Sequence, residues 1–245
     1  MHYGIIAAGQ GSRLRQEGVE MPKPLVHLNG VPMLERLITI FNACGAESIN
    51  IIINPHMAEV RDYLGSLCCA APLRVVEADT PSSMHSFYEL SRTIGFTHKF
   101  ILTTVDTVFL PDEFSSYVRT FEHNQADIDA LMGVTAFVDD EKPLYVSADP
   151  DKNITEFTDT KTAQTTFVSG GIYGLTPSAV RVLEQCIDSG ISRMRNFQRA
   201  LLTAGLRVKA FPFEKIIDVD HADDIPKAES MIASGGLNNS PQCLI

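Results

Sequence analysis

Residues 4–25 of the chain read GIIAAGQGSRLRQEGVEMPKPL. The first of them are apolar or small, which predicts a buried β-strand, and this strand runs directly into the turn Gly9-Gln10-Gly11-Ser12. Glycine lets the backbone approach a ligand closely, and the successive N–H groups of such a turn can surround an anion. The stretch therefore predicts a strand followed by a phosphate-binding loop.

Outward from this stretch, short apolar runs rich in β-branched residues alternate with segments of helical periodicity. We expect strands over residues 3–7, 48–53, 73–77, 100–104 and 131–137. Between them, apolar residues recur at helical spacing, as Leu34, Leu37, Ile38 and Phe41 do before a stop at Gly45. Alternating strands and helices predict βαβ units, and hence a three-layer α/β/α sandwich of Rossmann-like type with a mixed, mainly parallel sheet.

The alternation loosens after about residue 139. Short strands are expected there as a small antiparallel insertion, near residues 144–148, 154–157 and 171–175. Helices over residues 177–188 and 195–204 and strands near 208–211 and 216–219 should follow. The last residues contain Gly-Gly, Asn-Asn and a proline, which are typical of a loose terminus. We expect a single domain over residues 1–233 and a flexible C-terminal tail over 234–245.

The composition narrows the class of partners. The chain has 245 residues, of which 44% are hydrophobic, and a net charge of −10, as expected for a globular protein. This charge argues against a general surface for nucleic acid or anionic membranes, because both need clustered Lys and Arg. There is no run of 18 apolar residues, and the N-terminus lacks the features of a signal peptide. The five cysteines have no metal or disulfide spacing, so we expect reduced thiols and a cytoplasmic protein.

Two cationic residues accompany the glycine-rich turn. Arg13 follows it directly, and Lys23 stands between Pro22 and Pro24, which should present the lysine from an extended backbone. Cations over a phosphate-binding loop suit phosphoryl chemistry, because they neutralise charge on the transferring group. A Walker loop is excluded because no Lys follows the glycines. A dinucleotide fingerprint is excluded because Leu14 stands where a third small residue is required.

Carboxylates follow two of the expected strands. Ligands of open parallel sheets bind at the carboxyl ends of the strands, and Asp106 comes directly after a buried apolar strand. Asp218 and Asp220 fall on one face of the late strand, so both could point at one cation. Magnesium prefers oxygen ligands and is usually held by one or two carboxylates plus phosphates. We therefore predict a magnesium site, whereas Asp223 and Asp224 are expected as charges at a helix N-terminus.

The motif G-x-G-x-R followed by P-K-P-L closely resembles that of a family of nucleotidyltransferases. The family includes sugar-1-phosphate nucleotidylyltransferases, small cytidylyltransferases and molybdopterin-type NTP transferases. The resemblance implies a nucleotide-diphospho-sugar transferase-like fold. It also implies attack of an acceptor phosphate oxygen on the α-phosphorus of a nucleoside triphosphate, with loss of pyrophosphate. Arg13 and Lys23 would be the catalytic cations, neutralising the triphosphate and the transition state.

The same resemblance implies the other residues of the nucleotide and metal site. Asp106 would hold Mg²⁺ or Mn²⁺ together with Asp218, as the sugar-nucleotide members favour, or with Asp220, as the cytidylyltransferases favour. The chain departs from the family in having Val105 where a glycine usually precedes the metal carboxylate. The nucleotide would be bound by the loop and by two residues farther along, a set comprising Ala7, Ala8, Gly9, Gln10, Gly11, Ser12, Ser83 and Thr104.

For the acceptor, the resemblance points to Gly171, Tyr173 and Lys161, with Lys161 on the acceptor's phosphate. The partners would be a nucleoside triphosphate, with CTP favoured by the Asp218-Val-Asp220 pattern, and a small sugar-1-phosphate or polyol or alcohol phosphate. We expect a monomer or a homodimer. Two alternatives remain open: a molybdopterin nucleotidyltransferase with a bulkier acceptor, and a non-catalytic nucleotide or sugar-nucleotide sensor on the same scaffold. The retention of Arg13, Lys23 and Asp106 speaks against the sensor.

Overall fold

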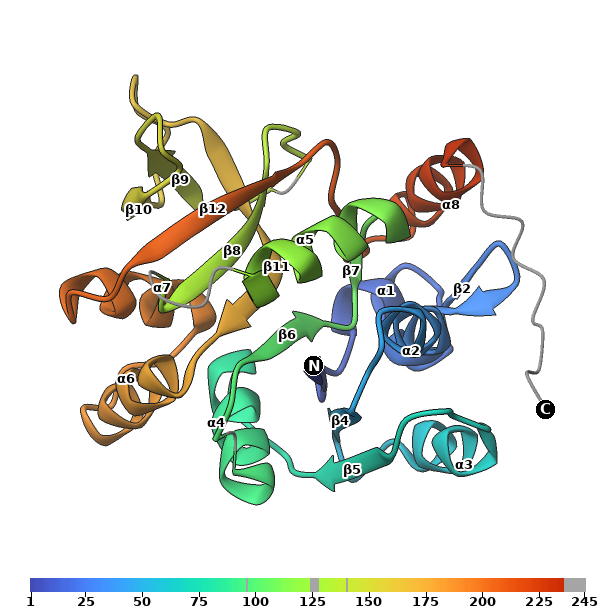
Figure 1. Ribbon diagram of the computed structural model, residues 1–245. Coiled ribbons are helices and arrows are strands. Elements are labelled where there is room, and N and C mark those ends of the chain that lie inside the picture. Colours follow the sequence, from blue (N-terminus) through green and yellow to red (C-terminus); the bar gives the residue numbers. More distant parts are fainter. Residues whose placement is uncertain (96, 124–127, 140, 236–245) are drawn as a thin grey trace.

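The computed structural model of the protein describes residues 1–95, 97–123, 128–139 and 141–235, and it centres on a nine-stranded sheet (Figure 1). The strands lie in the order β10-β9-β11-β6-β1-β4-β5, and β8 pairs with both β11 and β12. Within this sheet, β10 and β11 run against the direction of the other strands. The strands are β1 (His2–Ala7), β4 (Ser48–Ile53), β5 (Leu73–Glu77), β6 (Phe100–Thr104), β8 (Ala130–Thr135), β9 (Tyr145–Ala148), β10 (Ile154–Thr158), β11 (Phe167–Leu175) and β12 (Val208–Phe213).

Helices cover both faces of the sheet, which confirms the predicted three-layer sandwich (Figure 1). Side chains of β1 alternate between the layers, with Ile6 in one apolar core and Ile5 in the other, as the period of a strand requires. The first core is completed by α4 (Ser83–Ile94), α6 (Pro177–Asp188) and α7 (Met194–Thr203). The second is completed by α2 (Met33–Ala43), α3 (Ala58–Ser66) and α5 (Pro111–His123).

A third, smaller core joins the two ends of the chain near the glycine-rich loop. Leu14 of α1 (Ser12–Gln16) is buried there beside Ile217 and beside Ala228 of α8 (Asp224–Ser234). The short strands β7 (Thr107–Val108) and β13 (Ile217–Asp218) pair antiparallel next to it, and β2 (His27–Leu28) pairs with β3 (Val31–Pro32). This core holds the predicted loop and the late acidic segment together, although about 200 residues separate them in the sequence.

The strands over residues 48–53, 73–77 and 100–104 match the predicted boundaries, and Gly45 has the positive φ of a helix stop. The predicted antiparallel insertion is wrong for β11, which lies between β6 and β8 in the main sheet. The pairing of β11 with β8 shifts its register at Gly170-Gly171. Gly171 adopts a φ of 71° there, and the strand then continues beyond the shift. Helix α8 extends to Ser234, and the remainder of the predicted tail, 236–245, lies outside the described residues.

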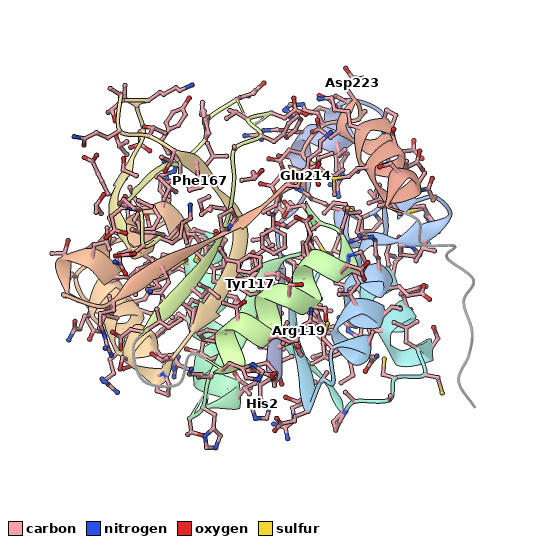
Figure 2. All side chains as sticks on the ribbon, turned by 45° about the horizontal axis from the view of Figure 1, so that its top comes forward. His2, Tyr117, Arg119, Phe167, Glu214 and Asp223 are labelled. Carbon is pink, nitrogen blue, oxygen red and sulfur yellow. The ribbon has the colours of Figure 1, made fainter. Side chains whose placement is uncertain are left out.

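The strand order creates a crevice at the carboxyl ends of β1 and β6. The chain leaves β1 for β4 by way of α2 on one face, and leaves β5 for β6 by way of α4 on the other. Such a reversal of strand order opens a gap between neighbouring connections, where open α/β sheets bind their ligands. Figure 2 shows His2, at the start of β1, and Asp223, before α8, at opposite ends of the molecule. No helix in the described ranges is long and apolar enough to cross a membrane.

Candidate active site

The glycine-rich loop passes directly over Lys23. Gly11 has φ 60° and ψ 37°, and a Cβ atom at this position would lie 2.8 Å from the Cβ of Lys23. A side chain at position 11 would therefore meet both an unfavourable backbone conformation and a steric clash. Leu14, which is 1% exposed, anchors the following helix α1 in the third core. The glycine is thus explained by the close approach of the loop to the lysine.

The ammonium of Lys23 lies between two carboxylates. Its Nζ donates to Asp106 Oδ2 and to Asp220 Oδ1, both at 2.5 Å, and the residue is buried. The predicted extended backbone at Lys23 is wrong: Lys23 begins the 3₁₀ helix η1 (Lys23–Leu25). A proline is tolerated at the start of a helix because the N–H it lacks would have no partner there. Arg13 adds a second cation, since its Nη1 lies 3.0 Å from Asp220 Oδ2.

The ladder between β7 and β13 brings the predicted carboxylates together. Thr107 pairs with Asp218 across the ladder, its hydroxyl donates to Asp218 Oδ1 at 3.0 Å, and the N–H of Val219 donates to the Asp106 carbonyl at 3.0 Å. Val105, which departs from the resembled motif, is 5% exposed and packs into the second core. Asp220 lies beyond the end of the strand, so it reaches Lys23 and Arg13 while Asp218 contacts Thr107.

The charges of this cluster are unevenly neutralised. Burial acts to raise the pKa of Asp106, but the adjacent Lys23 ammonium outweighs burial and holds the pKa below its usual value. Burial acts to lower the pKa of Lys23, but Asp106 and Asp220 outweigh it and hold the pKa above its usual value. Asp218 differs: burial, and after it the charge of Asp106, raise its pKa to about 7. Three carboxylates thus share two cations, which leaves Asp218 without one.

This donor set fits a magnesium ion. In the part of the chain that the structure describes, no three or more His, Cys, Asp and Glu side chains form a complete metal centre. Mg²⁺ does not need such a centre, because one or two carboxylates suffice when substrate phosphates supply further oxygens. Asp106 and Asp220 already converge on one cationic nitrogen, and Asp218 lines one cavity together with both of them. Asp218 and Asp220 are both placed to complete the set with Asp106.

A cleft of about 570 Å³ extends from this cluster along the glycine-rich loop. Its volume lies within the range of small-molecule and cofactor sites, which is roughly 300–1,000 Å³. Ala7, which is 1% exposed, points into the second core and does not line it. The cleft is lined by the other predicted nucleotide residues, namely Ala8, Gly9, Gln10, Gly11, Ser12, Ser83 and Thr104, and by Arg13, Lys23 and Asp106.

Sequence reasoning missed two residues at the far end of this cleft. The buried amide of Asn54 donates to Asp79 Oδ1 at 2.9 Å, and Asn54 Oδ1 accepts from the N–H of His56 at 3.0 Å. These bonds fix the amide and so hold the Asp79 carboxylate in place at the cleft wall. Asn54 directly follows β4, and Asp79 comes just after β5. The positional rule that singled out Asp106 could therefore have found both.

A second cleft, of about 320 Å³, opens on the other side of the carboxylates. The predicted acceptor residues Gly171 and Tyr173 line it, together with Asp106, Asp218 and Asp220. A Cβ atom on Gly171 would lie 2.4 Å from Thr107 Oγ1, so glycine is required for the strand to pass this close. Lys161 is exposed and lines neither of these two clefts. The structure therefore does not bring Lys161 to the other predicted acceptor residues.

Side chains from the start of α7 occupy the wall of the second cleft instead. Arg193, Arg195 and Gln198 line it, and the buried Gln198 accepts a hydrogen bond from Ser169 at 2.8 Å. Arg195 is paired with Asp159, whereas Arg193 has no acidic partner among the described residues. Arg193 adopts φ 74° and ψ 137°, a sparsely populated conformation that costs a non-glycine residue about 1–3 kcal/mol and is enriched at functional sites. No sequence pattern identified these residues, because nothing in the period of α7 shows that it borders a cleft.

The chain is similar to known proteins along most of its length. Residues 4–168 match the model of the MobA-like NTP transferase domain. The chain is 29% identical over 148 residues to a bifunctional IPC transferase and DIPP synthase of Rubrobacter xylanophilus, with 60% of this chain and 30% of that protein covered. It is 39% identical over 161 residues to a 2-aminoethylphosphonate cytidylyltransferase of Lancefieldella rimae, with 54% of this chain and 65% of that protein covered. The alignments thus span less than two thirds of both relatives.

Solved structures share the fold. The inositol-1-phosphate CTP transferase from T. maritima superposes with a TM-score of 0.78 at 20% identity, covering 96% of each chain. HddC from Yersinia pseudotuberculosis gives 0.69 at 20% identity, covering 94% of this chain and 99% of that one. These likenesses confirm the predicted fold class, and the match over residues 4–168 confirms the predicted family. The protein belongs to the family of MobA-like NTP transferase domains.

Proposed function

We propose that the protein transfers a nucleoside monophosphate from a nucleoside triphosphate to a small phosphorylated acceptor and releases pyrophosphate. The observation that carries this proposal is the cation pair Arg13 and Lys23 held by carboxylates where the two clefts meet. Asp106 and Asp220 line both clefts, so a nucleotide in one and an acceptor in the other would meet at these side chains. Family membership supports the same reaction class.

In this proposal, the protein contributes position and charge rather than a covalent intermediate. An oxygen of the acceptor phosphate attacks the α-phosphorus, and the bond between that phosphorus and the bridging oxygen to the β-phosphate breaks. Lys23 and Arg13 neutralise the negative charge that spreads over the phosphate oxygens. Asp106, with Asp218 or Asp220, would hold Mg²⁺ or Mn²⁺. Such an ion, when bound, supplies charge stabilisation and orients the triphosphate.

We propose CTP as the nucleotide. The fixed carboxylate of Asp79 can accept a hydrogen bond from the exocyclic amino group of cytosine, whereas it would repel the carbonyl oxygen that uracil carries at the same place. Two of the similar proteins are by name a cytidylyltransferase and a CTP transferase, which supports this choice. Guanine and adenine also offer N–H groups to a carboxylate, so GTP and ATP are included in the substrate panel below.

Asp79→Asn should lower the preference for CTP over UTP by about tenfold, roughly the contribution of one hydrogen bond to a charged group. The asparagine amide can donate to the uracil carbonyl, which the carboxylate cannot. The measurement is the ratio of kcat/KM values for the two nucleotides with one acceptor. An unchanged ratio would show that Asp79 does not contact the base.

For the acceptor, we propose that Arg193 binds its phosphate or phosphonate group. Arg193→Ala should lower kcat/KM for the acceptor by roughly 10- to 150-fold, the range of a charge-assisted hydrogen bond of about 1.5–3 kcal/mol. CTP binding measured without acceptor should barely change. Lys161→Ala is the matched comparison, because the family resemblance assigned this role to Lys161. A loss confined to the Lys161 variant would reverse the assignment.

The proposed reaction is tested by pyrophosphate release from a panel of substrates. CTP, UTP, GTP and ATP would each be combined with inositol-1-phosphate, 2-aminoethylphosphonate and glucose-1-phosphate in the presence of Mg²⁺. We expect release with CTP and at least one of these small acceptors. Binding of a nucleotide without release in any combination would instead support a non-catalytic nucleotide sensor.

A further inference from the structure

A network outside the proposed machinery ties the glycine-rich loop to the late acidic segment. Glu17 stands at the C-terminal end of α1. Its Oε2 accepts a hydrogen bond from the N–H of Ala222 at 2.6 Å, and its Oε1 lies 2.6 Å from Nδ1 of His221. One carboxylate from the start of the chain thus binds two consecutive residues about 200 positions later.

The same acidic segment is held from its other side by Asp224. The Oδ2 of this residue accepts from the N–H of Asp220 at 3.2 Å and from the N–H of His221 at 2.9 Å. Asp224 is 8% exposed and is contacted by Lys227. The backbone from Asp220 to Ala222 therefore has a side-chain acceptor at each N–H, and Glu17 supplies the one that comes from the loop.

Helix α1 has few other attachments. It spans five residues, and Leu14 is the one that is buried. Arg13 is half exposed, and the pair that it forms with Asp220 is of the kind that contributes little by itself in solvent. Arg13 lies four residues before Glu17, on the same face of the helix and one turn earlier. The bonds of Glu17 are therefore the main polar constraint on the position from which Arg13 reaches the cleft.

We propose that Glu17 is a positioning residue, which holds the Arg13 helix against the segment of Asp220 through His221 and Ala222. The inference rests on the proposed function, because its consequence is the placement of a cation for triphosphate binding. A small displacement of a group aimed at a ligand can cost a large part of its effect. Loss of Glu17 should therefore weaken the binding of the nucleotide and leave the binding of the acceptor unchanged.

The central experiment compares Glu17→Ala with Glu20→Ala. Glu20 is an exposed acid on the same loop, so its variant removes the same charge without removing the network. For Glu17→Ala, we expect CTP binding with Mg²⁺ and without acceptor to weaken about tenfold, as is common when a supporting residue is removed. The acceptor KM should be unchanged. Glu17→Gln should recover part of the loss, because its carbonyl oxygen can still accept from the N–H of Ala222.

A double-mutant cycle identifies the residue through which Glu17 acts. In an Arg13→Ala background, Glu17→Ala should cause little further loss of CTP binding, because the group that it positions is already absent. A merely structural role predicts a different result, with a lower melting temperature and equal losses for CTP and acceptor. Either that pattern or fully additive losses in the cycle would overturn the proposal.

Hydrogen exchange gives a readout that needs no nucleotide. The amide of Ala222 and those of residues 12–17 should exchange faster in Glu17→Ala than in wild type or Glu20→Ala. Unchanged exchange would refute the network as a constraint on the loop, whatever the kinetics. Wild-type protein that releases no pyrophosphate with any substrate pair would defeat the proposed function, and the exchange rates would still decide the role of Glu17.

Discussion

Replacing Lys23 with methionine is expected to lower kcat by about 10²–10³-fold, the usual effect of removing one preorganised charge from a transition state. The Lys23 ammonium is buried between Asp106 and Asp220, so water cannot replace it easily. Methionine keeps most of the side-chain volume while removing the charge. Pyrophosphate release at saturating CTP and acceptor is the measurement.

Arg13→Ala should also reduce turnover strongly, whereas Arg15→Ala, on the exposed side of the same helix, should not.

The buried position of Lys23 means that its replacement should also lower the folding stability of the protein. Its place between two prolines predicted an extended backbone, but the residue begins a 3₁₀ helix, is buried and separates carboxylates. Without it, the partly buried carboxylates of Asp106 and Asp220 face each other with Asp218 nearby, and partly buried like charges without a counter-ion destabilise a fold. Lys23→Met should therefore melt at a lower temperature than Arg13→Ala, and added Mg²⁺ should recover part of the difference. A folded Lys23→Met protein with near wild-type kcat would contradict the role of Lys23.

The parts of the fold that sequence predicted best are those with strong local periodicity. The runs of β4 and β6 gave the right boundaries because parallel strands buried on both faces are continuous and apolar. The boundaries of β5 were also right, although this strand lies at the edge of the sheet and is largely exposed. The pair β7 and β13 is different. Each strand has two residues, too short for any period to be visible, yet their ladder places Asp106 beside Asp218. The sequence identified the carboxylates as candidate metal ligands, but their proximity depends on this long-range pairing.

The acceptor side shows the limit of motif transfer. Gly171 and Tyr173 could be carried over because both lie in β11, whose strand the sequence predicts over residues 171–175. Lys161 could not, because it belongs to an irregular segment whose path no pattern specifies. Arg193 was missed for the opposite reason: it precedes a regular helix, and its role follows from where that helix lies. The role of Glu17 likewise follows from a long-range contact, the hydrogen bond from the N–H of Ala222, which the sequence does not reveal.

Removing divalent cations should abolish turnover, and Mg²⁺ or Mn²⁺ should restore it. In the protein alone, Lys23 and Arg13 are both engaged by carboxylates, so a triphosphate approaching them also meets the negative charges of Asp106, Asp218 and Asp220. A divalent ion on these carboxylates would offset that repulsion and free the two cations for phosphate. The binding of metal and of CTP should therefore be mutually favourable.

Asp106→Asn separates this coupling from simple loss of activity. CTP affinity measured without acceptor should rise steeply with Mg²⁺ in the wild type and much less in the variant, because a neutral amide is a poorer ligand for magnesium. In the absence of metal, the variant should bind CTP no more weakly than wild type, since one repulsive charge has been removed. Asp112→Asn, at the exposed first turn of α5, is the matched control and should keep the wild-type dependence on Mg²⁺. Full turnover by the purified protein in excess chelator, or an identical Mg²⁺ dependence in Asp106→Asn, would mean that these carboxylates act on Lys23 and Arg13 alone.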